Sequence, residues 1–223
     1  MQPITALPLF PLQSVLFPGG LLPLRIFEVR YLDMIGRCHK AGTPFGVVCL
    51  TQGSEVQRPQ PRTDAGGPPA EVFAPESFLD IGTLARIDEL QRPQPGLLMI
   101  RCTGTRRFRV QRRERLRHGL WTGDVELIED DPEVPVPDDL QPVGEALRQL
   151  VARLEQPAPG TSGEMPLQPP YRWDDCGWLA NRWCELLPLP PEVKHRFMAL
   201  DNPLVRLELV ADALAQMGFK RAG

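Results

Sequence analysis

The chain has 223 residues, with 26 prolines, 19 glycines, a hydrophobic fraction of 42% and a formal net charge of −3. That hydrophobic fraction suffices for a packed core, and the many prolines and glycines predict numerous turns. The slightly acidic balance excludes a globally basic nucleic-acid-binding protein, and five cysteines without a C-x-x-C pair argue against a disulfide framework.

The first fifty residues predict the order strand, turn, strand, helix, strand. Short apolar runs at 4–10, 21–27 and 45–50 are bounded by proline or glycine, which is typical of buried strands. Proline cannot donate to a sheet ladder, so the prolines in these runs predict edge-like, bent or bulged strands. Between the second and third runs, apolar residues recur near helical spacing from Val29 to Cys38, with Gly42 as a stop signal.

Five sequence blocks occur in an order found in a known family. They are LPLFPL, VLFPGGLLPLRIFEVRY, FGVVCL, IGTLARI and LPLPPEVKHRFMALDNPLVRLELV. Together they resemble the N-terminal domain of Lon-type ATP-dependent proteases, which also occurs as a free-standing bacterial protein. One departure is Val29, where the family usually has a proline after the glutamate. The resemblance implies a PUA-like β pseudo-barrel that recognises polypeptide.

Residues 52–75 predict a long loop, because proline, glycine and charged residues dominate and apolar periodicity is absent. Val72 and Phe73 are the only sizeable apolar residues of this loop. We expect them to pack back on the sheet; a contact surface is the alternative.

Alternating apolar residues predict further strands at 78–90, 97–102, 106–116 and 120–128. Gly82 is expected to mark a bulge, and Gly104 to separate two strands. With the resemblance, these antiparallel strands imply an α+β protein. Its N-terminal part would be a PUA-like β pseudo-barrel with one inserted helix.

One predicted strand carries an arginine-rich face that suggests an RNA-binding alternative. If residues 106–117 are extended, one face holds Arg107, Arg109, Arg113, Arg115 and Arg117. A hairpin that sets Arg115 opposite Asp124, and Arg113 opposite Glu126, would neutralise much of this face. We therefore favour a solvated face with cross-strand ion pairs, and nucleic acid is the disfavoured partner.

An acidic, proline-spaced segment predicts a domain boundary. The sequence indicates a PUA-like β domain over residues 1–131, a linker over 132–139 and an α-helical domain over 140–223. Helical periodicity predicts four helices in this domain. The first begins at 140 and is capped by Asp138 or Asp139, and the second covers 173–187 with Asp174 near its start. The third is opened by Pro190-Pro191, and the fourth is started by Asp201 and Pro203. Trp178 and Trp183 are expected as core anchors, with ligand stacking as the alternative.

The sequence shows no catalytic constellation. It contains no G-x-x-x-x-G-K-[ST] phosphate loop, no serine in a recognisable nucleophile context and no histidine pair at zinc-ligand spacing. We therefore expect no enzymatic activity, cofactor or metal. Without a signal peptide or an apolar run of membrane-spanning length, we expect a cytoplasmic protein with no membrane partner.

The residues and the resemblance together favour a non-catalytic polypeptide-binding module. The expected partner is unfolded polypeptide or a partner protein, with a protease or chaperone as a further candidate, and the oligomeric state is left open. The candidate surface consists of apolar residues on the proline-interrupted strands and the long loop: Leu7, Leu9, Leu12, Leu22, Leu24 and Phe73.

Overall fold

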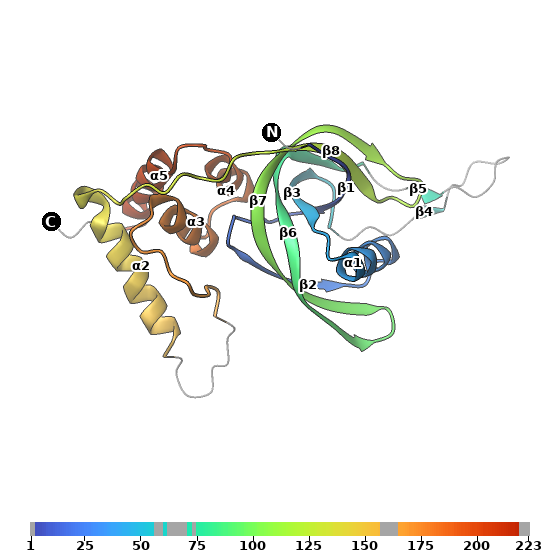
Figure 1. Cartoon of the computed structure of the whole chain (residues 1–223), viewed down its shortest axis with the longest axis horizontal. Helices are drawn as coiled ribbons and strands as arrows, with labels where there is room; N and C mark the ends of the chain where they lie inside the picture. The colour runs from blue at the N-terminus through green and yellow to red at the C-terminus, as the bar shows by residue number, and fades with distance from the viewer. Residues whose placement is uncertain (1–2, 56–59, 62–70, 73–74, 157–164, 219–223) are drawn as a thin grey trace. The chain divides into compact units, whose positions relative to one another are not determined.

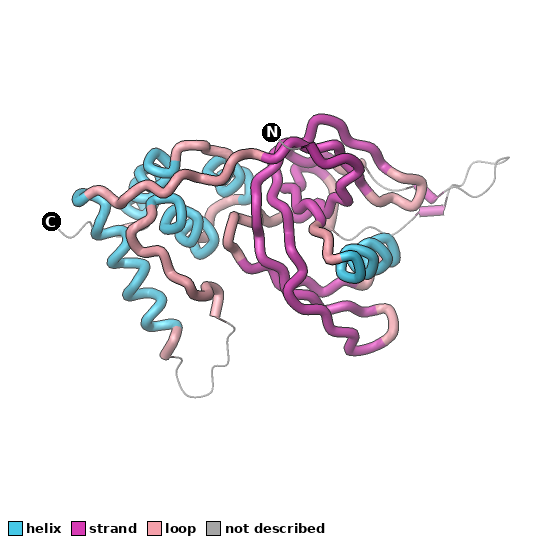
Figure 2. The backbone as a smooth tube through the Cα atoms, viewed as in Figure 1, coloured by secondary structure: helices cyan, strands magenta, loops and turns pink. Residues whose placement is uncertain are grey.

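The structure is a computed structural model that describes residues 3–55, 60–61, 71–72, 75–156 and 165–218. The chain divides into two compact units, Met1–Glu129 and Asp130–Gly223 (Figure 1). The first unit is built mainly of strands and the second of helices, as Figure 2 shows. We call them the β unit and the helical unit.

The β unit is a closed barrel with one extra edge strand and one inserted helix. Its elements are β1 (Pro3–Leu12), β2 (Leu21–Ile26), α1 (Val29–Ala41), β3 (Phe45–Gln52), β4 (Gln60–Pro61), β5 (Glu71–Val72), β6 (Ser77–Gln94), β7 (Leu97–Arg115) and β8 (Trp121–Leu127). The large sheet has the order β2-β7-β6-β3-β1-β8, and β7 also pairs with β8, which closes the ring. This architecture confirms the predicted α+β pseudo-barrel.

Strand β1 lies inside the barrel wall, whereas its prolines allowed an edge strand as one of the predicted arrangements. It pairs antiparallel with β8 over its first part and parallel with β3 over its second part, with a bulge between Ile4 and Leu7. Pro8 falls where only β8 pairs with β1, and Pro11 falls where only β3 does. A proline with a neighbour on one side need not remove a ladder hydrogen bond, so the strand tolerates both.

Helix α1 forms between β2 and β3, as its apolar spacing predicted. Gly42 ends it in the left-handed region, with φ 64°, where glycine is favoured. The buried face of the helix covers the barrel, and Tyr31 stacks on Phe10 with ring centroids 4.0 Å apart. Met34 and Ile35 extend the same buried face into one core cluster.

Strands β6 and β7 form one long hairpin, so Gly104 does not separate two strands. Gly104 lies inside β7, and its backbone N–H donates to the carbonyl of Gly20 at 2.8 Å. A Cβ on Gly104 would lie 2.2 Å from the carbonyl oxygen of Phe17. Glycine is needed at this position because two backbone segments approach closely. In the sequence alone, a glycine kept for that reason looks the same as one that ends a strand.

The described residues of the helical unit form a short 3-10 helix, η1 (Asp138–Leu140), and four α-helices, which confirms the predicted bundle. The helices are α2 (Gln141–Leu154), α3 (Cys176–Leu186), α4 (Pro191–Met198) and α5 (Pro203–Gln216). Trp183 of α3 is 1% exposed, and its indole N–H donates to the carbonyl of Val143 in α2 at 3.0 Å. Trp183 is therefore a core anchor.

Three helix starts differ from the sequence expectation. Asp175, not Asp174, caps α3 by accepting from the backbone N–H groups of Gly177 and Trp178. Asn202 caps α5 in the same way. Asp138 and Asp139 lie within η1, and α2 starts without a side-chain cap. When two adjacent polar residues could each cap a helix, the sequence does not show which one does, because the choice depends on where the backbone enters the helix.

The segment expected as a linker, residues 132–139, packs on the helical unit. The backbone N–H of Cys176 donates to the carbonyl of Val134 at 2.9 Å, and that of Val136 donates to Asp174 at 3.2 Å. Val136 is 7% exposed. The boundary between the units therefore falls between Glu129 and Asp130, and the prolines that follow keep a bound segment extended.

Candidate functional site

Three of the predicted binding residues lie in the barrel core. Leu7, Leu9 and Leu12 of β1 are 3%, 0% and 4% exposed. They are buried because their side chains pack in the two core clusters of the barrel. These leucines stabilise the barrel and do not form an accessible surface. Phe73, another predicted residue, lies outside the described residues.

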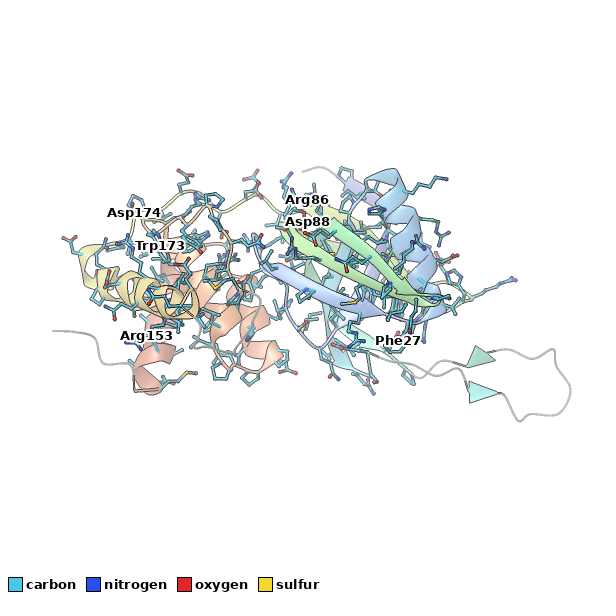
Figure 3. The ribbon with its side chains drawn as sticks, turned by 90° about the horizontal axis from the view of Figure 1, so that it is seen from below. Phe27, Arg86, Asp88, Arg153, Trp173 and Asp174 are labelled. Carbon is cyan, nitrogen blue, oxygen red and sulfur yellow. The ribbon has the colours of Figure 1, made fainter. Side chains whose placement is uncertain are left out.

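The remaining two predicted residues, Leu22 and Leu24, lie on the edge strand β2 and are half-buried. They pack against the same core cluster as Leu32 of α1. Phe27, which lies between β2 and α1 and is labelled in Figure 3, is 54% exposed, and Val29, the first residue of α1, is 79% exposed. We define these five residues as the β2–α1 strip.

A depression borders this strip where α1 approaches the tip of the β6–β7 hairpin. It is lined by Leu32, residues 92–96, Leu97 and Leu98, and its volume is about 430 Å³. Gly36 lies one turn after Leu32, and a Cβ there would meet nothing within 4 Å. The helix face that carries Val29, Leu32 and Gly36 therefore has open space beside it.

The residue spacing of α1 carries a signal for this surface. Val29, Leu32 and Gly36 are spaced i, i+3 and i+7, as expected for one helix face. That face is offset from the buried one formed by Met34, Ile35 and Cys38. Two apolar faces on one short helix indicate a second contact besides the core.

A buried carboxylate anchors one member of the arginine-rich strand. The side chain of Glu76 is 2% exposed; its Oε2 accepts from the indole N–H of Trp121 at 2.7 Å and lies 3.4 Å from Nη2 of Arg115. Its Oε1 lies 3.4 Å from Nη2 of Arg30, which also pairs with Glu28 at 3.0 Å. Arg115 thus belongs to an internal network of paired charges, where removing one partner is strongly destabilising.

The other predicted arginines do not form a continuous basic face either. Arg113 donates to the carbonyl of Phe78 at 3.0 Å and lies over its ring, 5.0 Å from the centroid. Arg107 is 4% exposed. Arg109 is exposed but lies opposite Glu126 of β8.

The hairpin register differs from the one the sequence suggested. Arg112 lies opposite Asp124, and Arg115 lies opposite Trp121. A bulge between Val110 and Arg112 shifts the pairing and interrupts the alternation of faces. The predicted stripe is therefore split between buried, paired and exposed positions.

The described residues hold neither a metal-ligand cluster nor an exposed thiol. No group of three or more histidine, cysteine or acidic residues is placed to hold a metal ion in the described part of the chain. All five cysteines are buried, and none of them forms a disulfide. Burial raises the pKa of the Cys102 and Cys184 thiols to about 12 and that of Cys176 to about 11, which keeps them protonated at neutral pH.

Within the described ranges, none of the helices has the length and apolar character that crossing a bilayer requires.

Comparisons with known proteins agree with this geometry. The sequence matches the family described as "ATP-dependent protease La (LON) substrate-binding domain" over residues 6–216. A crystal structure of a Lon N-terminal domain protein from Xanthomonas campestris is 31% identical, with a TM-score of 0.67, covering 94% of this chain and 98% of that one. The N-terminal domain of a Mycobacterium avium complex Lon protease shares the fold at 15% identity and a TM-score of 0.55, with the same coverage. The chain therefore belongs to the LON substrate-binding domain family.

Proposed function

We propose that this protein is a non-catalytic module that binds extended apolar segments of other polypeptides along the β2–α1 strip. The observation that carries the proposal is the exposure of Phe27 and Val29 beside half-buried Leu22, Leu24 and Leu32. Membership of a substrate-binding family supports polypeptide as the ligand class.

The strip offers binding free energy that folding leaves unused. Burying apolar surface contributes roughly 25 cal/mol per Å², and Phe27 and Val29 keep most of their surface in water. Pro23 removes a backbone donor from the edge strand β2, which weakens strand addition. We therefore assign recognition chiefly to side-chain burial in the depression beside Leu32.

The module would hold its ligand without degrading it. The sequence contains no phosphate-binding loop, and the described thiols are protonated and buried. The bound polypeptide would be a client or partner protein that is afterwards transferred to a protease or chaperone. The cytoplasmic location stays a prediction, which cell fractionation would test.

The test is binding of fluorescein-labelled, reduced and carboxymethylated α-lactalbumin, a permanently unfolded probe, followed by fluorescence anisotropy. Phe27→Ser and Val29→Ser should each weaken binding about five- to thirty-fold, since each removes a contact worth about 1–2 kcal/mol. Met99→Ser is the matched control, because Met99 is 39% exposed on the opposite face of β7 from core residues Leu98 and Ile100. All three variants should fold, because none of these side chains is buried.

Equal affinity of wild type and both strip variants would overturn this surface. A single-stranded RNA oligonucleotide serves as the competing ligand. Tight RNA binding that falls steeply with salt and is lost in Arg109→Gln would transfer the function to the arginine-rich strand.

A further inference from the structure

The helical unit has an aromatic depression that neither the fold nor the proposed function explains. It is lined by residues 133–135 on one side and residues 171–175 on the other, and its volume is about 460 Å³. Tyr171 and Trp173 supply the rings, and both are half-buried. Trp173 and Asp174 are labelled in Figure 3.

The rings belong to a rigid cluster of three. The ring centroids of Trp173 and Trp178 lie 5.0 Å apart at 79°, an edge-to-face contact, and those of Tyr171 and Trp173 are also 5.0 Å apart. The Tyr171 hydroxyl donates to Glu155 Oε1 at 3.0 Å. These contacts pack the three rings against one another beside the depression.

The cluster already attracts cations from the protein itself. The guanidinium carbon of Arg148 lies 5.4 Å from the Trp173 centroid, and that of Arg182 lies 6.0 Å from the Trp178 centroid. Aromatic faces attract cations through the ring quadrupole, and tryptophan does so most strongly. The same physics would apply to a cation that enters from the depression.

Charges around the depression complement such a cation. Its acidic residues are Glu133, Asp174 and Asp175, and its one basic residue is Arg172. Arg172 is paired with both Glu133, at 2.5 Å, and Asp175, at 2.7 Å. The side chains of Glu133 and Asp174 are 85% and 94% exposed, and Asp174 Oδ1 lies 4.0 Å from Nη2 of Arg148, a contact that a ligand cation would replace.

We propose that the aromatic depression binds the side chain of a lysine or arginine from another polypeptide. The apolar stem of the side chain would lie against Tyr171 and Trp173, and its charged end would reach Glu133 and Asp174. This site is separate from the β2–α1 strip and does not depend on it.

The test uses the indole N–H signals of the full-length protein in ¹⁵N-NMR spectra. The protein has four tryptophans, two in the cluster and two, Trp121 and Trp183, held by other hydrogen bonds. Titration with N-acetyl-lysine methylamide should shift the signals of Trp173 and Trp178 and leave those of Trp121 and Trp183 in place. The neutral isostere N-acetyl-norleucine methylamide should bind at least five-fold more weakly.

Two variants that keep the rings test the charge contribution. Glu133→Gln and Asp174→Asn should each weaken lysine-amide binding at least three-fold. Asp212→Asn, an exposed acid on α5, should leave it unchanged. Absence of any shift, equal binding of the norleucine amide, or unchanged affinity in both variants would overturn the proposal and leave the cluster with a packing role alone.

Discussion

The guanidinium of Arg206 in α5 and the carboxylate of Asp131 form a two-bond ion pair inside the helical unit. Nη1 of Arg206 donates to Asp131 Oδ2, and Nη2 lies 3.2 Å from Oδ1. The arginine side chain is 1% exposed and also donates to Asn181 and to the carbonyls of Phe197 and Leu200. The pair thereby holds the start of the unit's chain to its last helix.

Breaking this pair should destabilise the helical unit strongly. Arg206→Met removes the hydrogen bonds from the guanidinium to Asp131, to Asn181 and to two backbone carbonyls, and we expect a loss of about 3–5 kcal/mol in the free energy of unfolding. Arg206→Lys should recover only part of this, since an ammonium cannot reproduce the planar two-bond geometry. Urea unfolding followed by tryptophan fluorescence measures both. A loss below about 1 kcal/mol for Arg206→Met would contradict the assignment.

Two glycine-to-alanine substitutions should have opposite effects. Gly36 lies within α1 with nothing within 4 Å of its added Cβ, so Gly36→Ala should stabilise by up to about 1 kcal/mol through helix propensity. At Gly104 the same methyl group would lie 2.2 Å from the Phe17 carbonyl oxygen, and we expect a loss of about 1–3 kcal/mol or more. Thermal unfolding followed by circular dichroism measures the change in stability of both variants. If both substitutions stabilise the protein, the close approach at Gly104 is contradicted.

Ala6 is the only non-glycine residue with a positive φ, 52°, in the described part of the chain. It lies in the bulge of β1, and its backbone N–H donates to Asp124 Oδ1 at 3.1 Å. Ala6→Gly keeps this hydrogen bond and relieves the strain, so we expect stabilisation of about 0.5–1 kcal/mol. Ala152→Gly in exposed α2 is the control and should destabilise by about 1 kcal/mol, measured in the same unfolding assay.

The elements that local pattern determines were predictable. The residue spacing around Met34 and Ile35 and the stop at Gly42 identified α1, and Pro191 and Pro203 at helix starts identified α4 and α5. In each case the signal and the structure involve neighbours in sequence.

Features that depend on distant partners were not predictable. Leu7 and Leu9 are core residues because they pack in one cluster with Val48 of β3 and Val125 of β8, more than thirty residues away in sequence. The β7–β8 register places Glu126 opposite Arg109, four residues before Arg113, and the bulge after Val110 then shifts the pairing by one more residue. The alternation rule fails wherever a single extra residue enters a strand. The candidate strip was found only in part for the same reason, since Leu32 and the tip of the hairpin meet only in the folded barrel.

The cysteines should be unreactive in the folded protein. Burial raises the pKa of Cys102 to about 12, and the same cause raises the pKa of Cys38. A thiol–disulfide reagent such as DTNB at pH 8 should therefore modify fewer than one thiol per native chain within minutes and all five in urea. Ser14→Cys, at an exposed position, is the positive control and should react at once. Rapid reaction of a native thiol would contradict the burial.

The last prediction concerns Glu185, whose carboxylate lies 2.7 Å from Nη2 of Arg182 in α3. Burial raises the pKa of Glu185 from 4.5 to about 7, against the lowering effects of Arg182 and Lys194. A carboxyl with a raised pKa binds its proton more tightly in the folded state. Its contribution to stability is therefore present below about pH 4.5 and is lost as the pH rises through about 7.

Glu185→Gln should remove this dependence, because glutamine resembles the protonated acid at every pH. The difference in unfolding free energy between variant and wild type should be near zero at pH 5 and should favour the variant by on the order of 1–3 kcal/mol at pH 8. Urea unfolding at both pH values measures it, with exposed Glu145→Gln as the control that should show no such change. If the wild type instead gains stability relative to the variant as the pH rises, the ion pair with Arg182 outweighs the burial of Glu185.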